Sequence, residues 1–163
     1  MHPLRSRSLW TTTVLLHLAS LLTLSPAFAL LTTLRHHPAR PSSLPLVVPL
    51  IEHLLTLCRA RDAASVLRWL CRPDSPFRLA AATYAATIVG FWRLQDPRSA
   101  LAMLRDMAAD GFQASPELQE AVSDAMLQDT WMEEAWALEK SMQRPETQEV
   151  VELLDKLLAE WGP

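Results

Sequence analysis

The chain has 163 residues, enough for one domain, and a formal net charge of −3 at pH 7. Only three residues are glycine, too few for a Gly-rich phosphate loop, so dinucleotide-binding and P-loop enzymes are excluded. Half of the residues are apolar, Leu and Ala are the commonest, and alternating Val/Ile-rich runs are missing, which predicts an all-α fold.

Residues 1–45 predict a leader or a membrane anchor. They carry arginines but no acid, and Glu52 is the first acidic residue. Absent acids with Arg and Ser favour an organelle leader, whereas Ala27-Phe28-Ala29 fits the exit of a secretory signal. Residues 8–34 are uncharged, and within them the mostly apolar stretch from Val14 to Leu31 is just long enough for a membrane span. We favour an organelle leader, for a mitochondrion or a plastid, with a Pro-rich linker that ends at Pro45.

Residues 46–81 predict a helical hairpin. Apolar residues recur at helical spacing to about Cys58, so a first helix is expected there, with Arg59-Ala60-Arg61 as the turn. Asp62 is expected to cap the second helix. The buried side of that second helix would carry Val66, Leu67 and Leu70.

Cys58 and Cys71 are not expected to form a disulfide. Cys71 lies nine residues beyond Asp62, or roughly 13 Å further along the hairpin at about 1.5 Å per residue. A disulfide requires Cα atoms within about 7 Å. We therefore expect two buried thiols in a reducing compartment.

Cap chemistry predicts four helix starts in residues 79–142. The first helix runs from Leu79 to about Arg93, and Asp96-Pro97 starts the second, which Gly111 ends in a left-handed conformation. Ser115-Pro116 starts the third, and Thr130-Trp131-Met132-Glu133 matches the capping box of the fourth. The expected core residues of the first two helices are Tyr84, Ile88, Phe91, Leu101, Leu104 and Met107.

Residues 146–161 predict a closing helix that covers the last hairpin. Its apolar face would carry Val150, Val151, Leu154, Leu157, Leu158 and Trp161. Binding of a partner is the alternative, with Trp161 as the anchor. Most of Trp69, Trp92, Trp131, Trp136 and Trp161 are expected to pack between hairpins, with one or two exposed for a partner.

A repeat of 35 residues relates two of these hairpins. Ala100 recurs as Ala135 and Met107 as Met142, and a fixed period in this range indicates stacked helical repeats. The unit that holds Thr83-Tyr84, Ile88, Gly90, Ala100-Leu101, Met107 and Gly111 resembles the pentatricopeptide repeat. The tetratricopeptide repeat is the close rival. The resemblance implies a right-handed α-solenoid of about three hairpins, with units 46–81, 82–116 and 117–145.

Members of the pentatricopeptide family typically bind single-stranded RNA in organelles, one base per repeat. The base-reading positions that the resemblance implies are Ala86, Pro116 and Ala121, whose side chains offer no donor or acceptor for a base edge. From Ala82 onward 15 acids face 6 Lys/Arg, whereas residues 52–81 carry a balance of +2. Candidate phosphate contacts are therefore Arg59, Arg61, Arg68, Arg72 and Arg93.

These patterns favour an adaptor in organelle RNA metabolism that binds RNA weakly or as part of a complex. The alternative is a protein-binding scaffold, or a structural subunit of an organellar complex, without direct RNA readout. A fragment of a longer repeat protein is a third possibility. No cofactor, small-molecule substrate or enzymatic activity is expected, and a membrane is expected as a partner only through residues 8–34. His36-His37 and His53 do not make a metal site, which needs three or four converging ligands.

Overall fold

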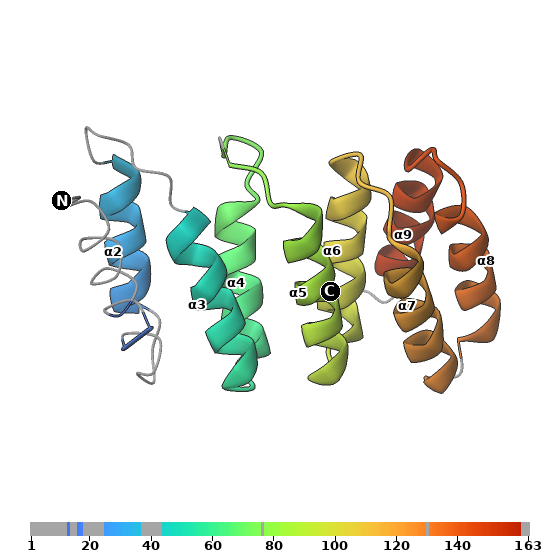
Figure 1. Ribbon diagram of the computed structural model, residues 1–163, viewed down its shortest axis with the longest axis horizontal. Helices are drawn as coiled ribbons and strands as arrows, with labels where there is room; N and C mark the ends of the chain where they lie inside the picture. Colours follow the sequence, from blue (N-terminus) through green and yellow to red (C-terminus); the bar gives the residue numbers. More distant parts are fainter. Residues whose placement is uncertain are drawn as a thin grey trace, which may run out of the picture. The chain divides into compact units, whose positions relative to one another are not determined.

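The computed structural model describes residues 13, 16–17, 25–36, 44–75, 77–129 and 131–160. Within these ranges it contains eight α-helices, α2 to α9, and no strand (Figure 1). The all-α prediction is confirmed. The chain divides into two compact units, residues 1–79 and residues 80–163, and each is described by itself.

The first unit contains α2 (Ser25–His36), α3 (Leu44–Thr56) and α4 (Ala60–Leu70). Helices α3 and α4 pack against each other as the expected hairpin. Their contact buries apolar side chains at helical spacing, among them the predicted Val66, Leu67 and Leu70. An ion pair of 2.9 Å between Arg35 of α2 and Asp74 connects α2 to the turn that follows α4.

The turn of this hairpin comprises residues 57–59, two positions earlier than the predicted Arg59-Ala60-Arg61. Cys58 has a φ of 58°, and this left-handed residue reverses the chain so that α4 already begins at Ala60. Asp62 therefore lies inside the first turn of α4, and its predicted role as N-cap is wrong. Its carboxylate instead accepts a hydrogen bond of 2.6 Å from Arg59 Nε.

The two cysteines are free thiols, as predicted, but they are not both buried. Cys58 is exposed because the turn projects it to solvent, and Cys71 is half-buried after the end of α4. The prediction of two buried thiols is therefore wrong for Cys58.

The second unit contains α5 (Ala81–Arg93), α6 (Pro97–Ala109), α7 (Pro116–Gln128), α8 (Met132–Met142) and α9 (Gln148–Glu160). Helix α5 packs on α6, α7 packs on α8, and α5 also lies beside α7. All six predicted core residues of α5 and α6 are buried. The repeat pairs are buried in both copies: Ala100 and Ala135, and Met107 and Met142.

Three of the predicted end signals are confirmed in the second unit. Asp96 Oδ1 accepts a hydrogen bond of 3.1 Å from Ser99 N, and Ser115 Oγ accepts one of 3.3 Å from Leu118 N. Gly111 has a φ of 83° after the end of α6. The predicted capping box is wrong, because Trp131 is the N-cap of α8 and its side chain makes no capping hydrogen bond. The backbone N–H of Trp131 donates to Met126 O at 3.1 Å, so the turn after α7 extends one residue further, to Trp131.

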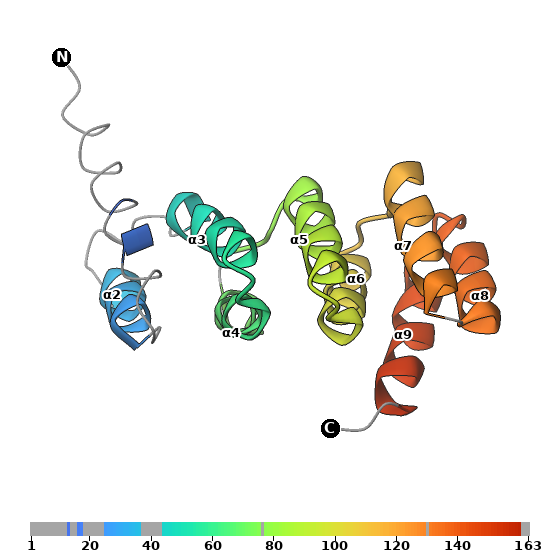
Figure 2. The same cartoon turned by 90° about the horizontal axis from the view of Figure 1, so that it is seen from below.

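The last helix packs on two helices of the unit. Helix α9 packs mainly on α6 and to a lesser extent on α8, so it lies beside the middle of the unit (Figure 2). The predicted apolar face is used in this contact: Val150, Val151, Leu154 and Leu157 are buried, and Leu158 is half-buried. Regular stacking of the two hairpins would require α6 to pack extensively on α8. It does not, because α9 occupies that place beside α6. The helix predicted after Pro145 is present and buries its apolar face, mainly against α6 and in part against α8.

Candidate functional site

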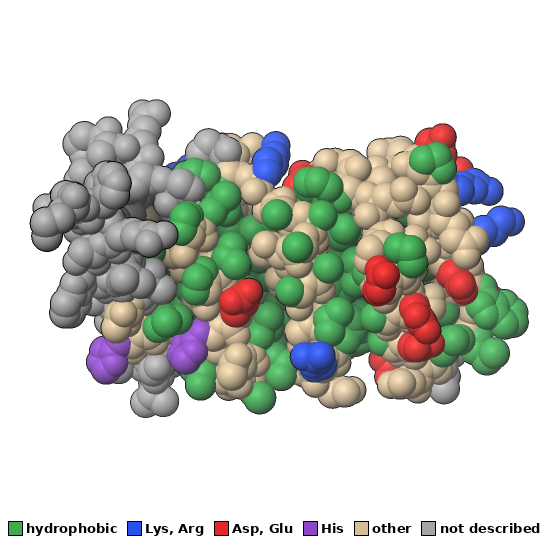
Figure 3. All heavy atoms as spheres, in the orientation of Figure 1, with side chains coloured by type: hydrophobic (Ala, Val, Ile, Leu, Met, Phe, Trp, Pro, Cys, Tyr) green, Lys and Arg blue, Asp and Glu red, His purple; other side chains and the backbone are tan. Residues whose placement is uncertain are grey.

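The implied base-reading positions lie on the two neighbouring helices α5 and α7. Ala86 is exposed on α5, Pro116 is exposed at the start of α7, and Ala121 is half-exposed one turn later. The same side of α7 carries the exposed carboxylates Glu117, Glu120 and Asp124. Figure 3 shows acidic side chains over α7. This surface offers no base-specific donor at the three positions, and its charge repels phosphate.

The candidate phosphate contacts are divided between the two units, four in the first and Arg93 in the second. Arg61, Arg68 and Arg72 are exposed on one side of α4 and just beyond its end, where helical spacing aligns them. Arg59 is half-buried and occupied by Asp62. Arg93 is exposed in the last turn of α5, which belongs to the other unit. The basic group that remains is the set of three on α4.

Trp161, the predicted partner anchor, lies outside the described residues. The apolar face of α9 that precedes it is buried against α6 and α8. That face is therefore used within the unit and does not present itself to a partner.

An exposed apolar surface lies instead on α8. Trp136 is 61% exposed and Met132 is 53% exposed, one helical turn apart, while Ala135, Leu138 and Met142 fill the buried side of the same helix. Leu127, at the end of α7 before the turn into α8, is 39% exposed. We call Leu127, Met132 and Trp136 the α8 apolar edge. Figure 3 shows hydrophobic side chains at this outer margin of the second unit.

One or two of the tryptophans are predicted to be exposed, and Trp136 is one that the structure exposes. The spacing of the apolar residues in α8 already indicated that Trp136 is exposed. Trp136 is adjacent to the repeat residue Ala135, so a helix that buries Ala135, Leu138 and Met142 turns Trp136 and Met132 away from the core.

The α8 apolar edge is surrounded by uncompensated negative charge. Helices α7 and α8 and the turn between them carry one lysine, Lys140, and seven acids: Glu117, Glu120, Asp124, Asp129, Glu133, Glu134 and Glu139. Among the described residues, none of these seven carboxylates forms an ion pair. Their field is therefore directed outward, toward solvent or a partner.

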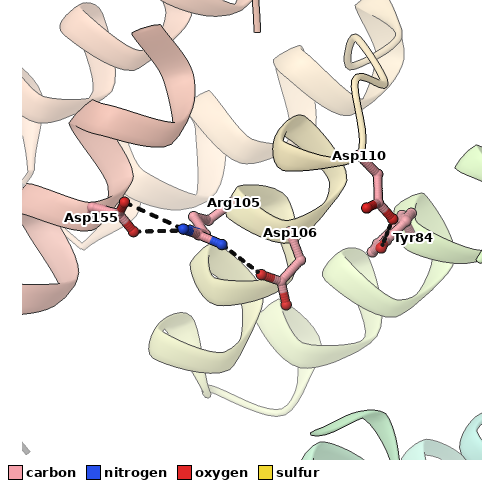
Figure 4. Close-up of polar contacts among 5 residues, drawn as sticks. All are labelled: Tyr84, Arg105, Asp106, Asp110 and Asp155. Atoms are coloured by element: carbon pink, nitrogen blue, oxygen red, sulfur yellow. Dashed lines mark hydrogen bonds and ion pairs between the residues drawn. The ribbon is translucent and has the colours of Figure 1, made fainter. Parts of the chain in front are cut away.

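A polar network connects α6 to its neighbours (Figure 4). Arg105 donates to both carboxylate oxygens of Asp155 in α9, at 2.9 and 3.4 Å, and contacts Asp106 at 3.4 Å. Tyr84 of α5 donates a hydrogen bond of 2.6 Å to Asp110 Oδ2. The side chains join three helices, so their evident role is to hold α5, α6 and α9 together.

The pKa of Asp106 in this network is shifted. Partial burial raises its pKa above the ordinary value, and the nearby carboxylates of Asp110 and Asp155 add to the effect, while Arg105 opposes it. A perturbed carboxylate in a cleft would suggest catalysis. Here the carboxylate lies half-exposed on a helix surface beside structural ion pairs.

Two recesses of the second unit are too small for a ligand. One, between α6, α9 and the end of α8, is lined by Leu104, Met142 and Val150 among others and has a volume of about 10 Å³, room for roughly one water. The other, lined by Met126, Trp131, Glu134, Leu157 and Glu160, has about 40 Å³. Neither can hold a substrate.

The described residues contain no group of three or more His, Cys, Asp or Glu placed to hold a metal ion. None of the helices in this part of the chain combines the length and hydrophobicity needed to cross a bilayer. Comparison of the chain with protein-family models, with curated protein sequences and with solved structures found no match.

Proposed function

We propose that this chain is a protein-binding scaffold of helical hairpins, and that the α7–α8 hairpin holds the partner. The observation that carries the proposal is the exposure of Trp136 and Met132 on one side of α8. Tryptophan dominates the binding energy of many protein interfaces, because it buries a large area at little conformational cost. A solvent-exposed Trp–Met pair has no stabilising role in the folded unit that would explain it.

Two further features support protein over nucleic acid as the ligand of this hairpin. Its seven unpaired carboxylates repel a phosphate backbone. The implied base-reading positions Ala86, Pro116 and Ala121 present no hydrogen-bonding side chain.

The test is affinity capture of the tagged full-length chain from the cells that express it, with quantitative mass spectrometry. A specific protein should co-purify with the native chain and be lost with the double variant Met132→Ala/Trp136→Ala. Leu57→Ala is the matched control, since Leu57 is also an exposed apolar residue, at 42%, but lies in the α3–α4 turn. A set of co-purifying proteins that the double variant leaves unchanged would refute the proposal.

RNA binding in an organelle, as the resemblance to the pentatricopeptide family implies, is the second candidate function. The exposed row of Arg61, Arg68 and Arg72 favours it. A salt series with single-stranded RNA should then show binding that weakens steeply as salt rises, and that replacement of the three arginines with glutamine abolishes. Absence of binding at low salt would exclude this candidate.

The family-like architecture and the leader belong to this second proposal. The packing of α5 on α7 supports stacking of successive hairpins in a right-handed α-solenoid, whereas the placement of α9 on α6 departs from regular stacking. An organelle leader in residues 1–45 would be tested by locating the tagged protein and by sequencing the N-terminus of its mature form.

A further inference from the structure

We infer that the partner segment held by the α7–α8 hairpin is a basic, amphipathic helix. This inference rests on the proposed scaffold function and specifies its ligand. It is argued from the shape of the apolar surface, the charge around it and the position of its single lysine.

The apolar part of the surface is a narrow stripe. Met132 and Trp136 are four residues apart on α8, and Leu127 lies at the neighbouring end of α7. A stripe one or two side chains wide matches the apolar face of a single helix, which presents residues at the same spacing of three or four. It does not match the broad apolar area that a stable obligate dimer buries.

The charge around the stripe selects the polar residues of the partner. Asp129 and Glu133 are exposed beside it, and Glu117, Glu120 and Asp124 are exposed along α7. In Figure 3 the acidic side chains over α7 and the hydrophobic side chains at the outer margin appear on the same face. Because no described cation pairs with these carboxylates, lysines or arginines of a partner gain attraction without breaking an existing ion pair.

The single lysine sets a direction along the hairpin. Lys140 lies one turn beyond Trp136, toward the C-terminal end of α8, and Arg144 follows, paired with Glu149 of α9. Positive charge is therefore confined to one end of α8, and the acids Asp129 and Glu133 lie at the other. The basic residues of the partner helix should accordingly lie over the N-terminal half of α8.

The experiment measures binding of three synthetic peptides to the full-length chain by fluorescence anisotropy. The first is an amphipathic helix with Leu and Trp on one face and Lys on the other. The second replaces every Lys with Glu, and the third keeps the composition of the first but scrambles it so that no apolar face remains. We expect binding of the first peptide only, weakening steeply with added salt.

Protein variants then locate the site. Met132→Ala/Trp136→Ala should weaken binding of the basic peptide about tenfold or more. Asp129→Lys/Glu133→Lys should weaken it similarly, whereas the control Glu52→Lys/Glu152→Lys makes the same change of net charge at exposed positions outside the α7–α8 hairpin, on α3 and α9, and should have little effect. Lys140→Glu should strengthen binding. Circular dichroism confirms that each variant is folded, and all of the substituted side chains are exposed.

Several results would overturn the inference. Equal binding of the Lys and Glu peptides would remove the charge argument, and equal binding of the scrambled peptide would remove the helical one. Equal effects of the two charge-reversal variants would reduce the attraction to net charge alone. A Trp136-dependent dimer in sedimentation experiments would identify a second copy as the occupant instead. If cellular capture still depends on Trp136 while the basic peptide fails to bind, the scaffold function stands and only the basic-helix inference fails.

Discussion

The packing of α9 on α6 can be tested with two neighbouring residues that face opposite ways. Leu154 is fully buried in this contact, whereas Asp155 forms the exposed ion pair with Arg105. Leu154→Ala should lower the free energy of unfolding of the second unit by about 2–5 kcal/mol, because it removes buried methyl groups and leaves a cavity. Asp155→Asn should lower the free energy of unfolding by only about 0.2–1 kcal/mol, because the ion pair with Arg105 is largely solvated and stabilises the unit mainly through its good geometry.

The free energy of unfolding of a unit of this size is roughly 4–13 kcal/mol. The cost of Leu154→Ala is a large fraction of it, whereas the cost of Asp155→Asn is a small one. The assay is urea denaturation followed by far-ultraviolet circular dichroism, with amide hydrogen exchange read separately for peptides from α6 and α9. Leu154→Ala should accelerate exchange in both helices, because each covers the other. If Asp155→Asn destabilises as much as Leu154→Ala, or if exchange accelerates in α9 alone, the two helices do not pack as described.

Three further substitutions test local features of the chain. Asp106→Asn should raise the urea midpoint at neutral pH. Because the pKa of Asp106 is raised in the folded state, its charged carboxylate destabilises the fold at pH values above its titration range. The advantage of Asn should therefore shrink as the pH falls toward 3.8, the ordinary pKa of an aspartate. Gly111→Ala should destabilise the second unit by about 1 kcal/mol through the φ of 83° alone, since nothing lies within 4 Å of the added Cβ. Gly111→Asn should cost less, because Asn tolerates this conformation better. Equal urea midpoints for the Gly and Ala proteins would contradict this. Cys58→Gly should stabilise the α3–α4 hairpin by about 0.5–1 kcal/mol because φ is 58° there, whereas Cys58→Ala, with the same strain, should give no such gain in thermal denaturation.

Features determined by neighbouring residues could be predicted from the sequence. Asp96 and Ser115 cap helices through hydrogen bonds to backbone amides three residues away, and Gly111 provides the left-handed residue after α6. Buried faces followed from the spacing of apolar residues, because helix geometry fixes which side chains share a side. The errors at Asp62 and Thr130 are shifts of helix starts, where two local signals compete within a few residues.

Features determined by distant residues could not be predicted. Arg105 and Asp155 are fifty positions apart, and nothing in either local sequence indicates that α9 lies on α6. The spacing of Ala135, Leu138 and Met142 indicates that Trp136 is exposed, but the packing of α7 on α8 that places Leu127 and the acids of α7 in the same hairpin surface is not visible in it. The candidate site therefore became visible only once α7 and α8 were packed, although its acidic character was already evident in the sequence.

The contact of α9 with α6 has a consequence for how the protein is made. While the ribosome is still adding the last residues, Leu104 and Ala108 of α6, which lie beside Val150 in the finished unit, are not yet covered by α9. Until the chain is released and α9 can pack, one apolar side of α6 must stay exposed to water or be bound by a chaperone. Premature termination between Pro145 and Gln148 would make that temporary exposure permanent, and the shortened product should be aggregation-prone even though four of the unit's five helices are intact.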